Sequence, residues 1–521
     1  MCKRSYEPTI DPVWRGNTLR QAEPWIRKCL KYDPVCRQRG HGKGLPTRVI
    51  DVGPSDGSQD PFIYIPEQPI LAEEDKGNEN GPSEDWIWWQ AFIKGKGVSY
   101  GKTRYVSLSY CWGKTQNLVT TLENIESLKS CIPWSDIPQT VRGAISITRG
   151  LGIRYLWVDA LCIIQDSPED WDKESVKMAN VYGGAFLTLS AAHGADVNEG
   201  LPRRVATEKH RFPLQNDHLY SRAWALQERM LSTRVLIFGS DQIYWECHHT
   251  QEGEDGKKLP ATMSYRLPQN PSRKDWNRIV QDYTSRCLTN EMDKLPAVSG
   301  LAEVYRQATN HTYMAGLWRE TLLKNLLWKQ HWLLYGNKVE PGIPSRWRAP
   351  SWSWASIDGN VRMIEFPKDE GVENSTIVGT HMDVALNLSG SPRGHWICLS
   401  GPLLEGDIKA DKIFFIGGGY CALWIDIPED TSGGPQRSDV GPSTDWQYEA
   451  PEQKSVWCLL IVTTKYNGYY EGHGLVLAKS DVVGESVFRR VGYFITVGTK
   501  GESPSWKTQF EECKASTIFL I

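Results

Sequence analysis

The apolar residues of this chain are most tightly grouped in a segment that predicts a strand, a helix and a second strand. The run YLWVDALCII at 155–164 is almost wholly apolar and is followed by Ser167 and Pro168, as expected of a strand buried on both faces. Ser167 is placed to cap a helix, and Pro168 to occupy its first position. The run FLTLSAA at 186–192 completes a β-α-β unit, whose strands we expect to pair in parallel.

Two carboxylates in this unit occupy positions where the pattern predicts burial. Asp159 lies within the first apolar run, and Glu174 shares a helical face with Trp171, Met178 and Val181 at steps of three and four. Acidic side chains are rarely buried unless they are paired. Both are therefore candidate functional residues. The alternative for Glu174 is a structural pairing with Arg154 or a backbone amide, and the alternative for Asp159 is a pairing with a turn amide or an arginine.

A further strand and helix precede this unit, so the order of elements is β-α-β-α-β. RYVSLSYCWG at 104–113 has the pattern of a strand and a turn, and a helix begins at Pro138 and ends near Gly150 or Gly152. This order predicts an α/β fold with an open, doubly wound and mostly parallel sheet. In such sheets, ligands bind at the carboxyl ends of the strands.

The candidate pocket therefore consists of residues at those strand ends and on the next helix. In SRAWALQERMLSTRVLIFG at 221–239 a helix precedes a strand, and Trp224 and Glu228 are one helical turn apart. An aromatic ring and a carboxylate in this arrangement suit a ribose, whereas the alternative for Glu228 is an exposed ion pair with Arg222, Arg229 or Arg234. The pocket candidates are Ser109, Tyr110, Cys111, Trp112, Cys162, Asp166 and Trp224.

The pattern changes along the chain and divides it into five parts. We expect DQIYWEC at 241–247 to form a hairpin with the strand before it, and residues 251–275 to be a polar loop. The five parts are an N-terminal cap segment (1–53), a loop-rich insertion (54–100), the α/β domain (101–250), a helical region with a Trp-rich segment (251–360) and a β-rich C-terminal region (361–521).

Composition narrows the class of protein. The 521 residues are enough for about two to four domains. A net charge of −3 provides no field that favours nucleic acid. No run approaches the roughly 18 apolar residues of a membrane-spanning helix, and the start of the chain lacks the apolar core of a secretory signal. The 12 cysteines are scattered, which favours reduced thiols in the cytoplasm.

The cysteines could take part in nucleophilic catalysis or in metal binding, and no sequence feature favours either role. Cys111 or Cys162 would need His193 as a base for nucleophilic catalysis, and no sequence feature brings that histidine into reach. A small apolar filler is the more common role of a buried cysteine.

Metal binding is suggested at two places but is complete at neither. Cys29, Cys36 and His41 fit no common zinc spacing and lack a fourth ligand, and the triplet CHH at 247–249 has no spaced partner. We therefore expect no metal and no resident cofactor.

Several blocks of the sequence resemble those of the fungal heterokaryon-incompatibility (HET) domain. The opening block is YVSLSYCWG at 105–113, the long central block begins with LGIRYLWVDALC and spans 151–185, and RAWALQERMLSTRVLIFG at 222–239 is similar to the closing block. The flanking segments CLKYDPVC at 29–36 and RAPSWSWAS at 348–356 also resemble proteins of this family. The resemblance covers most of the chain from about residue 25 to about residue 360.

The resemblance implies a fold and a biological role. The HET domain is thought to be a distant relative of the TIR domain, which has a flavodoxin-like α/β fold, and many TIR domains cleave NAD with a glutamate. The family acts in fungal non-self recognition and triggers programmed cell death. Its partner would be an allelic or non-allelic incompatibility protein, or a second copy of this chain. The chain lacks the P-loop and the WD-type repeats of larger incompatibility proteins.

Two hypotheses follow for the function of the domain. In the first, the domain is a signalling and interaction module that triggers death without chemistry of its own. In the second, it hydrolyses the nicotinamide–ribose bond of NAD, which would then be a substrate, with Glu174, Glu228 and Asp159 as the candidate catalytic residues. The two hypotheses are distinguished by whether these three carboxylates face one open cleft or separate packing environments.

Overall fold

The structure is a computed structural model, and it describes most of the chain in seventeen segments. These segments are 12–32, 35–36, 44–67, 104–115, 117–201, 217–259, 266–268, 270–331, 342–366, 371–382, 395–409, 412–415, 420–425, 455–466, 468–480, 486–498 and 504–521. His41 and residues 68–100 of the predicted insertion lie outside them.

The chain divides into two compact units. The first unit contains residues 1–268 and 296–301, and the second contains residues 269–295 and 302–521. The helix Pro296–Thr309 contributes its first residues to the first unit and the rest to the second.

The first unit is built on an eight-stranded sheet in the order β2-β1-β4-β3-β5-β6-β7-β8. All five residues of β3, all four of β5 and all five of β6 are buried, as the apolar runs predict for strands covered on both faces. The strands are β1 (Val49–Asp51), β2 (Phe62–Tyr64), β3 (Tyr105–Ser109), β4 (Tyr155–Trp157), β5 (Leu187–Ser190), β6 (Arg234–Phe238), β7 (Ile243–Cys247) and β8 (Gln251–Gly253).

Parallel pairing is confined to the centre of this sheet. β3 pairs in parallel with β4 and with β5, and β5 pairs in parallel with β6, which confirms the predicted β-α-β unit. The prediction of a mostly parallel sheet is wrong for the eight-stranded sheet as a whole, because its outer strands β1, β2, β7 and β8 all pair antiparallel. Short hairpin loops join β6, β7 and β8, and such loops connect only antiparallel strands.

Two local predictions also need correction. The apolar run at 155–164 is not one strand, because β4 ends at Trp157 and a single helical turn, α6 (Asp159–Cys162), follows. The Asp159 carboxylate accepts a hydrogen bond from the Ala160 N–H (2.7 Å), and this contact helps to start the turn. Residues 251–275 are not all loop, because β8 pairs with β7.

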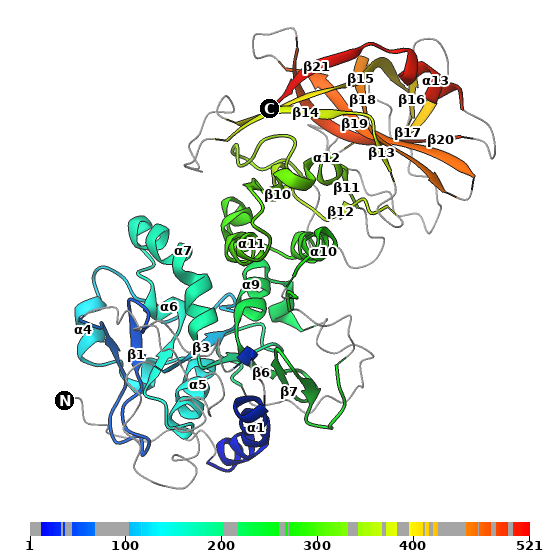
Figure 1. The fold of residues 1–521 in the computed structure, drawn as a ribbon. Coiled ribbons are helices and arrows are strands. Elements are labelled where there is room, and N and C mark those ends of the chain that lie inside the picture. The colour runs from blue at the N-terminus through cyan, green and yellow to red at the C-terminus, as the bar shows by residue number, and fades with distance from the viewer. Residues whose placement is uncertain are drawn as a thin grey trace, which may run out of the picture. The chain divides into compact units, whose positions relative to one another are not determined.

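The helices of the first unit cover both faces of the sheet. Right-handed crossover connections place α5 on one face and both α7 and α9 on the other. Accordingly, α7 packs against α9, while α1 packs against α5 (Figure 1). The helices are α1 (Pro12–Tyr32), α4 (Ile125–Ser130), η1 (Trp134–Asp136), α5 (Gln139–Gly150), α6, α7 (Pro168–Gly184), η2 (His218–Ser221) and α9 (Ala223–Leu231).

The start of α7 follows the sequence prediction. The Ser167 hydroxyl accepts a hydrogen bond from the Asp170 N–H (3.3 Å), and Pro168 occupies the first turn. Glu174, Met178 and Val181 are buried on one face of the helix, as their spacing predicts.

The second unit begins with helices and continues as short strands. Its first helix, α10, buries one face, which consists of Trp276, Ile279, Val280 and Tyr283. The helical pattern ends earlier than the sequence suggests, and paired two- and three-residue strands follow. The elements are α10 (Arg273–Thr284), η4 (Glu291–Lys294), α11 (Pro296–Thr309), β9 (Tyr313–Met314), β10 (Leu317–Trp318), η5 (Arg319–Thr321), α12 (Leu322–Asn325), β11 (Trp328–Gln330), η6 (Trp354–Ser356) and β12 (Val361–Met363).

The β-rich C-terminal region forms a ring of strands. β15 pairs with β16, and the pairings continue through β17, β20, β19 and β18 back to β15, so this part of the sheet closes on itself. The elements are β13 (Val372–Glu373), β14 (Thr376–Met382), β15 (His395–Lys409), β16 (Lys412–Phe415), β17 (Tyr420–Ile425), β18 (Ser455–Tyr466), β19 (Tyr469–Lys479), β20 (Val487–Val497), α13 (Ser505–Glu512) and β21 (Ala515–Leu520).

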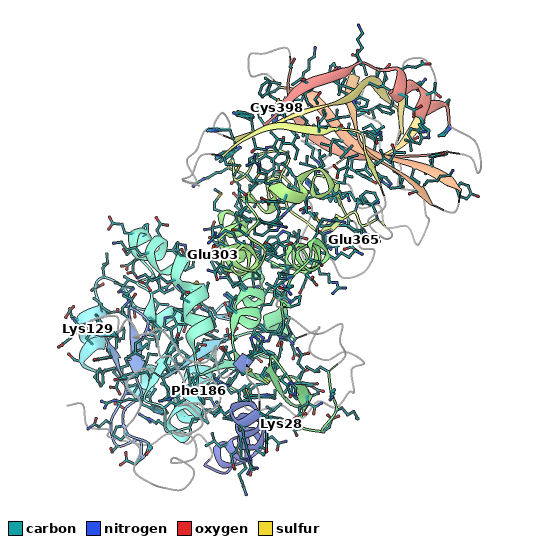
Figure 2. The ribbon with its side chains drawn as sticks, in the orientation of Figure 1. Lys28, Lys129, Phe186, Glu303, Glu365 and Cys398 are labelled. Carbon is teal, nitrogen blue, oxygen red and sulfur yellow. The ribbon has the colours of Figure 1, made fainter. Side chains whose placement is uncertain are left out.

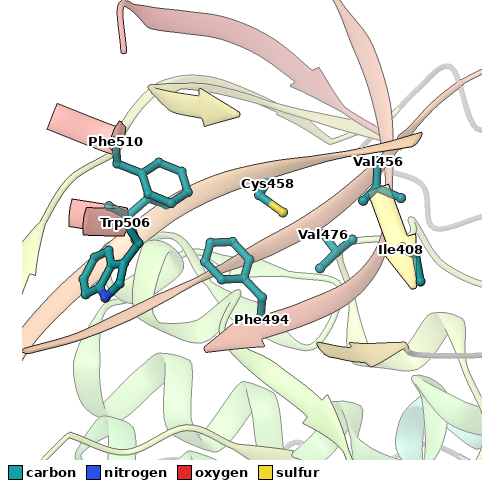
Figure 3. Close-up of a cluster of buried hydrophobic side chains, with 8 residues drawn as sticks. Ile408, Val456, Cys458, Val476, Phe494, Trp506 and Phe510 are labelled. Carbon is teal, nitrogen blue, oxygen red and sulfur yellow. The ribbon is translucent and has the colours of Figure 1, made fainter. Parts of the chain in front are cut away.

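A single apolar cluster joins this ring to α13. Alternate residues Val456 and Cys458 of β18 lie on one face of their strand and belong to the same buried cluster as Phe494 of β20 (Figure 3). Phe510 of α13 stacks on Phe494, with ring centroids 6.0 Å apart, and Trp506 of the same helix joins the cluster. The helix is therefore part of the core of the C-terminal region.

Gly300 of α11 provides a test of the packing in the first unit. Its N–H donates to the Gln227 side-chain oxygen (2.8 Å), and a Cβ at this position would lie 2.5 Å from the Cβ of Ala179. Gly300→Ala should therefore lower the free energy of unfolding by about 1–3 kcal/mol through overpacking, measured by denaturant unfolding. The control is Gly16→Ala in α1, where a Cβ meets nothing within 4 Å and helix propensity should add about 1 kcal/mol. Equal effects of the two substitutions would contradict this packing.

Candidate functional site

The candidate site lies at the carboxyl ends of the central strands. The chain leaves β3 toward β4 on one side and returns to β5 on the other, so the strand order reverses between β3 and β5. Such a switch point leaves a crevice beyond the strand ends in open α/β sheets. Ser109 ends β3 at this point, and Tyr110 and Trp112 follow it.

Glu228 of α9 lies buried beneath the end of β3. Only 3% of the residue is exposed, and the Ser109 hydroxyl donates a hydrogen bond to its Oε2. Tyr182 of α7 also hydrogen-bonds to this carboxylate, and its hydroxyl lies 3.2 Å from the Leu108 carbonyl oxygen. A strand and two helices thus enclose one acidic group.

Burial determines the protonation of Glu228. It raises the pKa of the carboxyl from 4.5 to about 7, although the Arg222 charge and the hydrogen bonds from Ser109 and Tyr182 act in the opposite direction. A carboxyl with this pKa is present in both protonation states near neutral pH, so it can accept or donate a proton.

Asp159 is the second acidic group of the site and is only half-buried. Its Oδ2 accepts a hydrogen bond from the Trp112 indole N–H (3.0 Å). Burial raises the pKa of Asp159, while Arg222 and the hydrogen bonds from Ala160, Trp112 and Tyr110 lower it. Asp159 and Trp112 are each partly exposed, so this group lies nearer to solvent than Glu228.

Arg222 connects the two acidic groups. Its guanidinium donates to the Tyr110 carbonyl oxygen. Burial by itself would lower the pKa of Arg222, but Glu228, Cys111, Asp159 and Tyr110 together raise it, so the arginine stays charged. We call Asp159, Glu228 and Arg222 the acidic cluster.

Sequence reasoning identified the carboxylates of this cluster but missed its cation and Tyr182. Arg222 was considered only as a surface partner of Glu228, and the prediction of an exposed ion pair is wrong because Glu228 is buried. Arg229, a second proposed partner, instead pairs with Glu246 (2.7 Å). The available signal was that Arg222 directly precedes the helix that carries Glu228.

The third candidate carboxylate, Glu174, lies outside the acidic cluster. It is buried and pairs with Lys177 (2.9 Å), which also donates to the Thr47 hydroxyl (3.0 Å). The predicted partner Arg154 pairs instead with Asp51 (2.8 Å). The structure therefore brings Asp159 and Glu228 together and leaves Glu174 in a separate environment.

Two further pocket candidates, Trp224 and Asp166, make contacts that are typical of core packing and of a turn. Trp224 meets Trp171 of α7 edge-on, with ring centroids 6.0 Å apart. Asp166 is exposed and accepts a hydrogen bond from the Leu122 N–H (2.8 Å), which is the role of a turn residue.

The thiols at the site are not arranged for nucleophilic catalysis. Burial raises the pKa of Cys162 to about 12, so the thiol stays protonated. His193 Nδ1 lies 3.1 Å from the Phe238 carbonyl oxygen, and its Nε2 finds no hydrogen-bond partner among the described residues. Cys111 is buried with Leu219 and Ala225.

The fold and the site together define an α/β domain that carries a buried acidic cluster at the switch point of its sheet. Residues 105–213 match the family model described as "Heterokaryon incompatibility protein (HET)", so the chain contains a HET domain. The match includes Ser109, Asp159 and Tyr182 and ends before Arg222 and Glu228. The comparisons with curated proteins and with solved structures gave no match. Across the described segments, no helix combines the length and apolar character that crossing a bilayer requires.

The pKa of Glu228 predicts a specific pH dependence of stability. Between pH values of about 4.5 and about 7, the folded chain holds a proton that the unfolded chain has released. The free energy of unfolding should therefore fall as pH rises through this window, by at most about 1.4 kcal/mol per pH unit from this group. Glu228→Gln does not titrate, so its thermal midpoint relative to the parent should rise over the same window.

The control for this measurement is Glu126→Gln. Glu126 is exposed and pairs with Lys129 on the surface of the same unit. Its thermal midpoint should stay at a constant offset from that of the parent across this pH range. A constant offset for Glu228→Gln as well would show that Glu228 titrates normally.

Proposed function

We propose that this chain is an incompatibility-type protein of fungal non-self recognition, and that its HET domain triggers programmed cell death as a signalling and interaction module. The match of residues 105–213 to the HET family model carries this proposal. The partner is an allelic or non-allelic incompatibility protein or a second copy of the chain, and the site of action is the cytoplasm.

The strand order supports a flavodoxin-like, and hence TIR-like, fold for the domain. The four parallel strands follow the order β4-β3-β5-β6. The first of these four along the chain, β3, is thus flanked by the second, β4, and the third, β5. This is the arrangement of flavodoxin-like sheets.

The closure of the site favours an interaction module over an enzyme. Only 3% of Glu228 is exposed, and the hydroxyls of Ser109 and Tyr182 occupy its hydrogen-bonding positions. A substrate group could reach this carboxylate only after neighbouring side chains moved. The acidic cluster then serves to fix the ends of β3 and α9 rather than to bind a ligand.

Expression of the full chain in a fungal host that lacks it tests this proposal. Induction should arrest growth and reduce viability. The cellular NAD level should stay constant until the cells lyse. Glu228→Gln keeps the shape of the side chain and should kill as the parent does. Survival of the parent strain at normal protein levels would contradict the death-triggering role, and an NAD decline before the loss of viability would contradict the module.

A second candidate function, NAD hydrolysis, is favoured by one observation. Asp159 and Glu228 both interact with Arg222 at the switch point, and the half-exposed Asp159 is on the solvent side. Cleavage of the nicotinamide–ribose bond passes through an oxocarbenium-like state, which a nearby carboxylate stabilises. Nicotinamide leaves with the bonding electron pair, and water supplies the oxygen to the ribose.

Purified chain with NAD tests the enzyme hypothesis directly. Nicotinamide release should fall about a hundredfold or more in Glu228→Gln and Asp159→Asn, because each removes a charge near the ribose. Glu126→Gln is the matched surface control and should keep the parent rate. Glu174→Gln should instead lower soluble yield, since Glu174 is a buried partner of Lys177.

Thermal midpoints of all variants should accompany the rates, so that loss of fold is separated from loss of chemistry. No nicotinamide release by the well-folded parent, or equal rates in all variants, would contradict NAD cleavage. Either result would leave the signalling module as the function of the domain.

A further inference from the structure

Three buried cysteines from distant parts of the chain meet at one point in the first unit. Cys29 lies on α1, Cys36 follows that helix, and Cys247 is the last residue of β7. Their sulfur atoms all lie within 4.8 Å of one another, and the three residues are 3%, 0% and 1% exposed. We call them the thiol cluster.

The tertiary structure assembles this cluster by packing α1 against β7 (Figure 1). Trp25 of α1 stacks on Trp245 of β7, with ring centroids 6.3 Å apart. One turn further along the helix, this contact brings Cys29 to the end of β7. The expectation that the triplet at 247–249 has no partner is therefore wrong, because its partners are on α1 and just beyond it.

The separations of the sulfur atoms suit a tetrahedral metal ion. Zinc–sulfur bonds of about 2.3 Å set the sulfurs of one site about 3.8 Å apart, which lies within the observed range. Disulfide formation cannot account for the cluster in full, because three thiols leave one unpaired. Soft thiolate ligands in a closed tetrahedral set select zinc over hard cations such as magnesium or calcium.

Hydrogen-bond donors are already directed at the sulfurs. The Thr250 N–H lies 3.4 Å from Cys247 Sγ, in a turn closed by the bond from the Cys247 N–H to the Thr250 carbonyl oxygen (2.9 Å). The Arg234 Nε–H lies 3.3 Å from Cys29 Sγ. Donors of this kind orient the ligands of metal sites and stabilise thiolates.

The local charge also fits a metal-bound trithiolate. Three thiolates and one Zn²⁺ carry a net charge of −1, and the buried guanidinium of Arg234 beside Cys29 balances it. Arg234 is fixed by further bonds to the carbonyl oxygens of Phe186 (3.1 Å) and Cys36 (3.0 Å). The cation is therefore held in place within the protein interior.

A further residue with a metal-binding side chain lines a small pocket together with two of these cysteines. The pocket is lined by Cys29, Cys247 and the exposed His249, together with Lys28 of α1, the helix on which Figure 2 labels Lys28. We propose that Cys29, Cys36, Cys247 and His249 bind one zinc ion. The site clamps α1 to β7, so the ion stabilises the first unit and takes no part in chemistry at the acidic cluster.

Metal content of the full chain tests the site. Protein purified under reducing conditions without chelator should contain about one zinc ion per chain, measured by elemental mass spectrometry. Cys247→Ser should lower that content about tenfold or more. The matched control is Cys398→Ser, because Cys398 is a buried cysteine of β15 in the other unit (Figure 2) and should leave the content unchanged.

Cobalt substitution keeps the proposal testable if Cys247→Ser fails to fold. The parent chain, stripped of metal and supplied with Co²⁺, should show thiolate-to-cobalt charge transfer and the intense visible bands of a tetrahedral site. A chelator should lower the thermal midpoint of the parent. His249→Ala should shift the cobalt bands, whereas His248→Ala should not.

Three results would overturn the zinc site or its fourth ligand. A reduced parent chain without zinc that also gives no cobalt bands overturns the site. Equal zinc in Cys247→Ser and Cys398→Ser overturns it as well, since the metal would then be bound elsewhere. Unchanged cobalt bands in His249→Ala overturn the assignment of the fourth ligand.

Discussion

The α/β unit depends on the enclosure of one carboxylate at the carboxyl end of β3. A buried ionised group costs several kcal/mol unless hydrogen bonds and an opposite charge compensate it. Glu228 receives its compensation from Ser109 on β3, from Tyr182 on α7 and from Arg222 ahead of α9. Glu228 can be buried in this way only when β3, α7 and the start of α9 are correctly placed. These contacts therefore fix the structure at the switch point of the sheet.

Buried charge is compensated locally elsewhere in each unit as well. In the α/β sheet, Glu246 of β7 lies between Arg229 (2.7 Å) and Arg266 (3.6 Å). In the second unit, the guanidinium of Arg490 lies over the ring of Trp328, with 3.4 Å to the ring centroid, and donates to backbone carbonyl oxygens of β11 and the residues before it. The guanidinium suits these positions because it combines several donors with a flat face.

The local sequence pattern was sufficient to predict the central strands and α7 of the first unit, and to predict that carboxylates lie at the candidate site. The buried runs of β3 and β5 and the cap at Ser167 are encoded in neighbouring residues, as is the spacing of the α7 face. Local pattern failed at 155–164, where Asp159 begins a helical turn inside an apolar run. Continuous apolar runs do not distinguish a strand from a buried turn of helix, because both are covered on all sides.

The sequence by itself determined that this is an α/β protein with a HET domain, a helical continuation and a β-rich C-terminal region, because period, caps and motif order are local properties. Only the tertiary structure decided which functional groups meet. It joined Asp159 to Glu228 through Arg222, separated Glu174 from them, and brought Cys247 to Cys29 and Cys36. These contacts depend on strand order and on the docking of α1, which residues far apart in the chain specify jointly and no short pattern records.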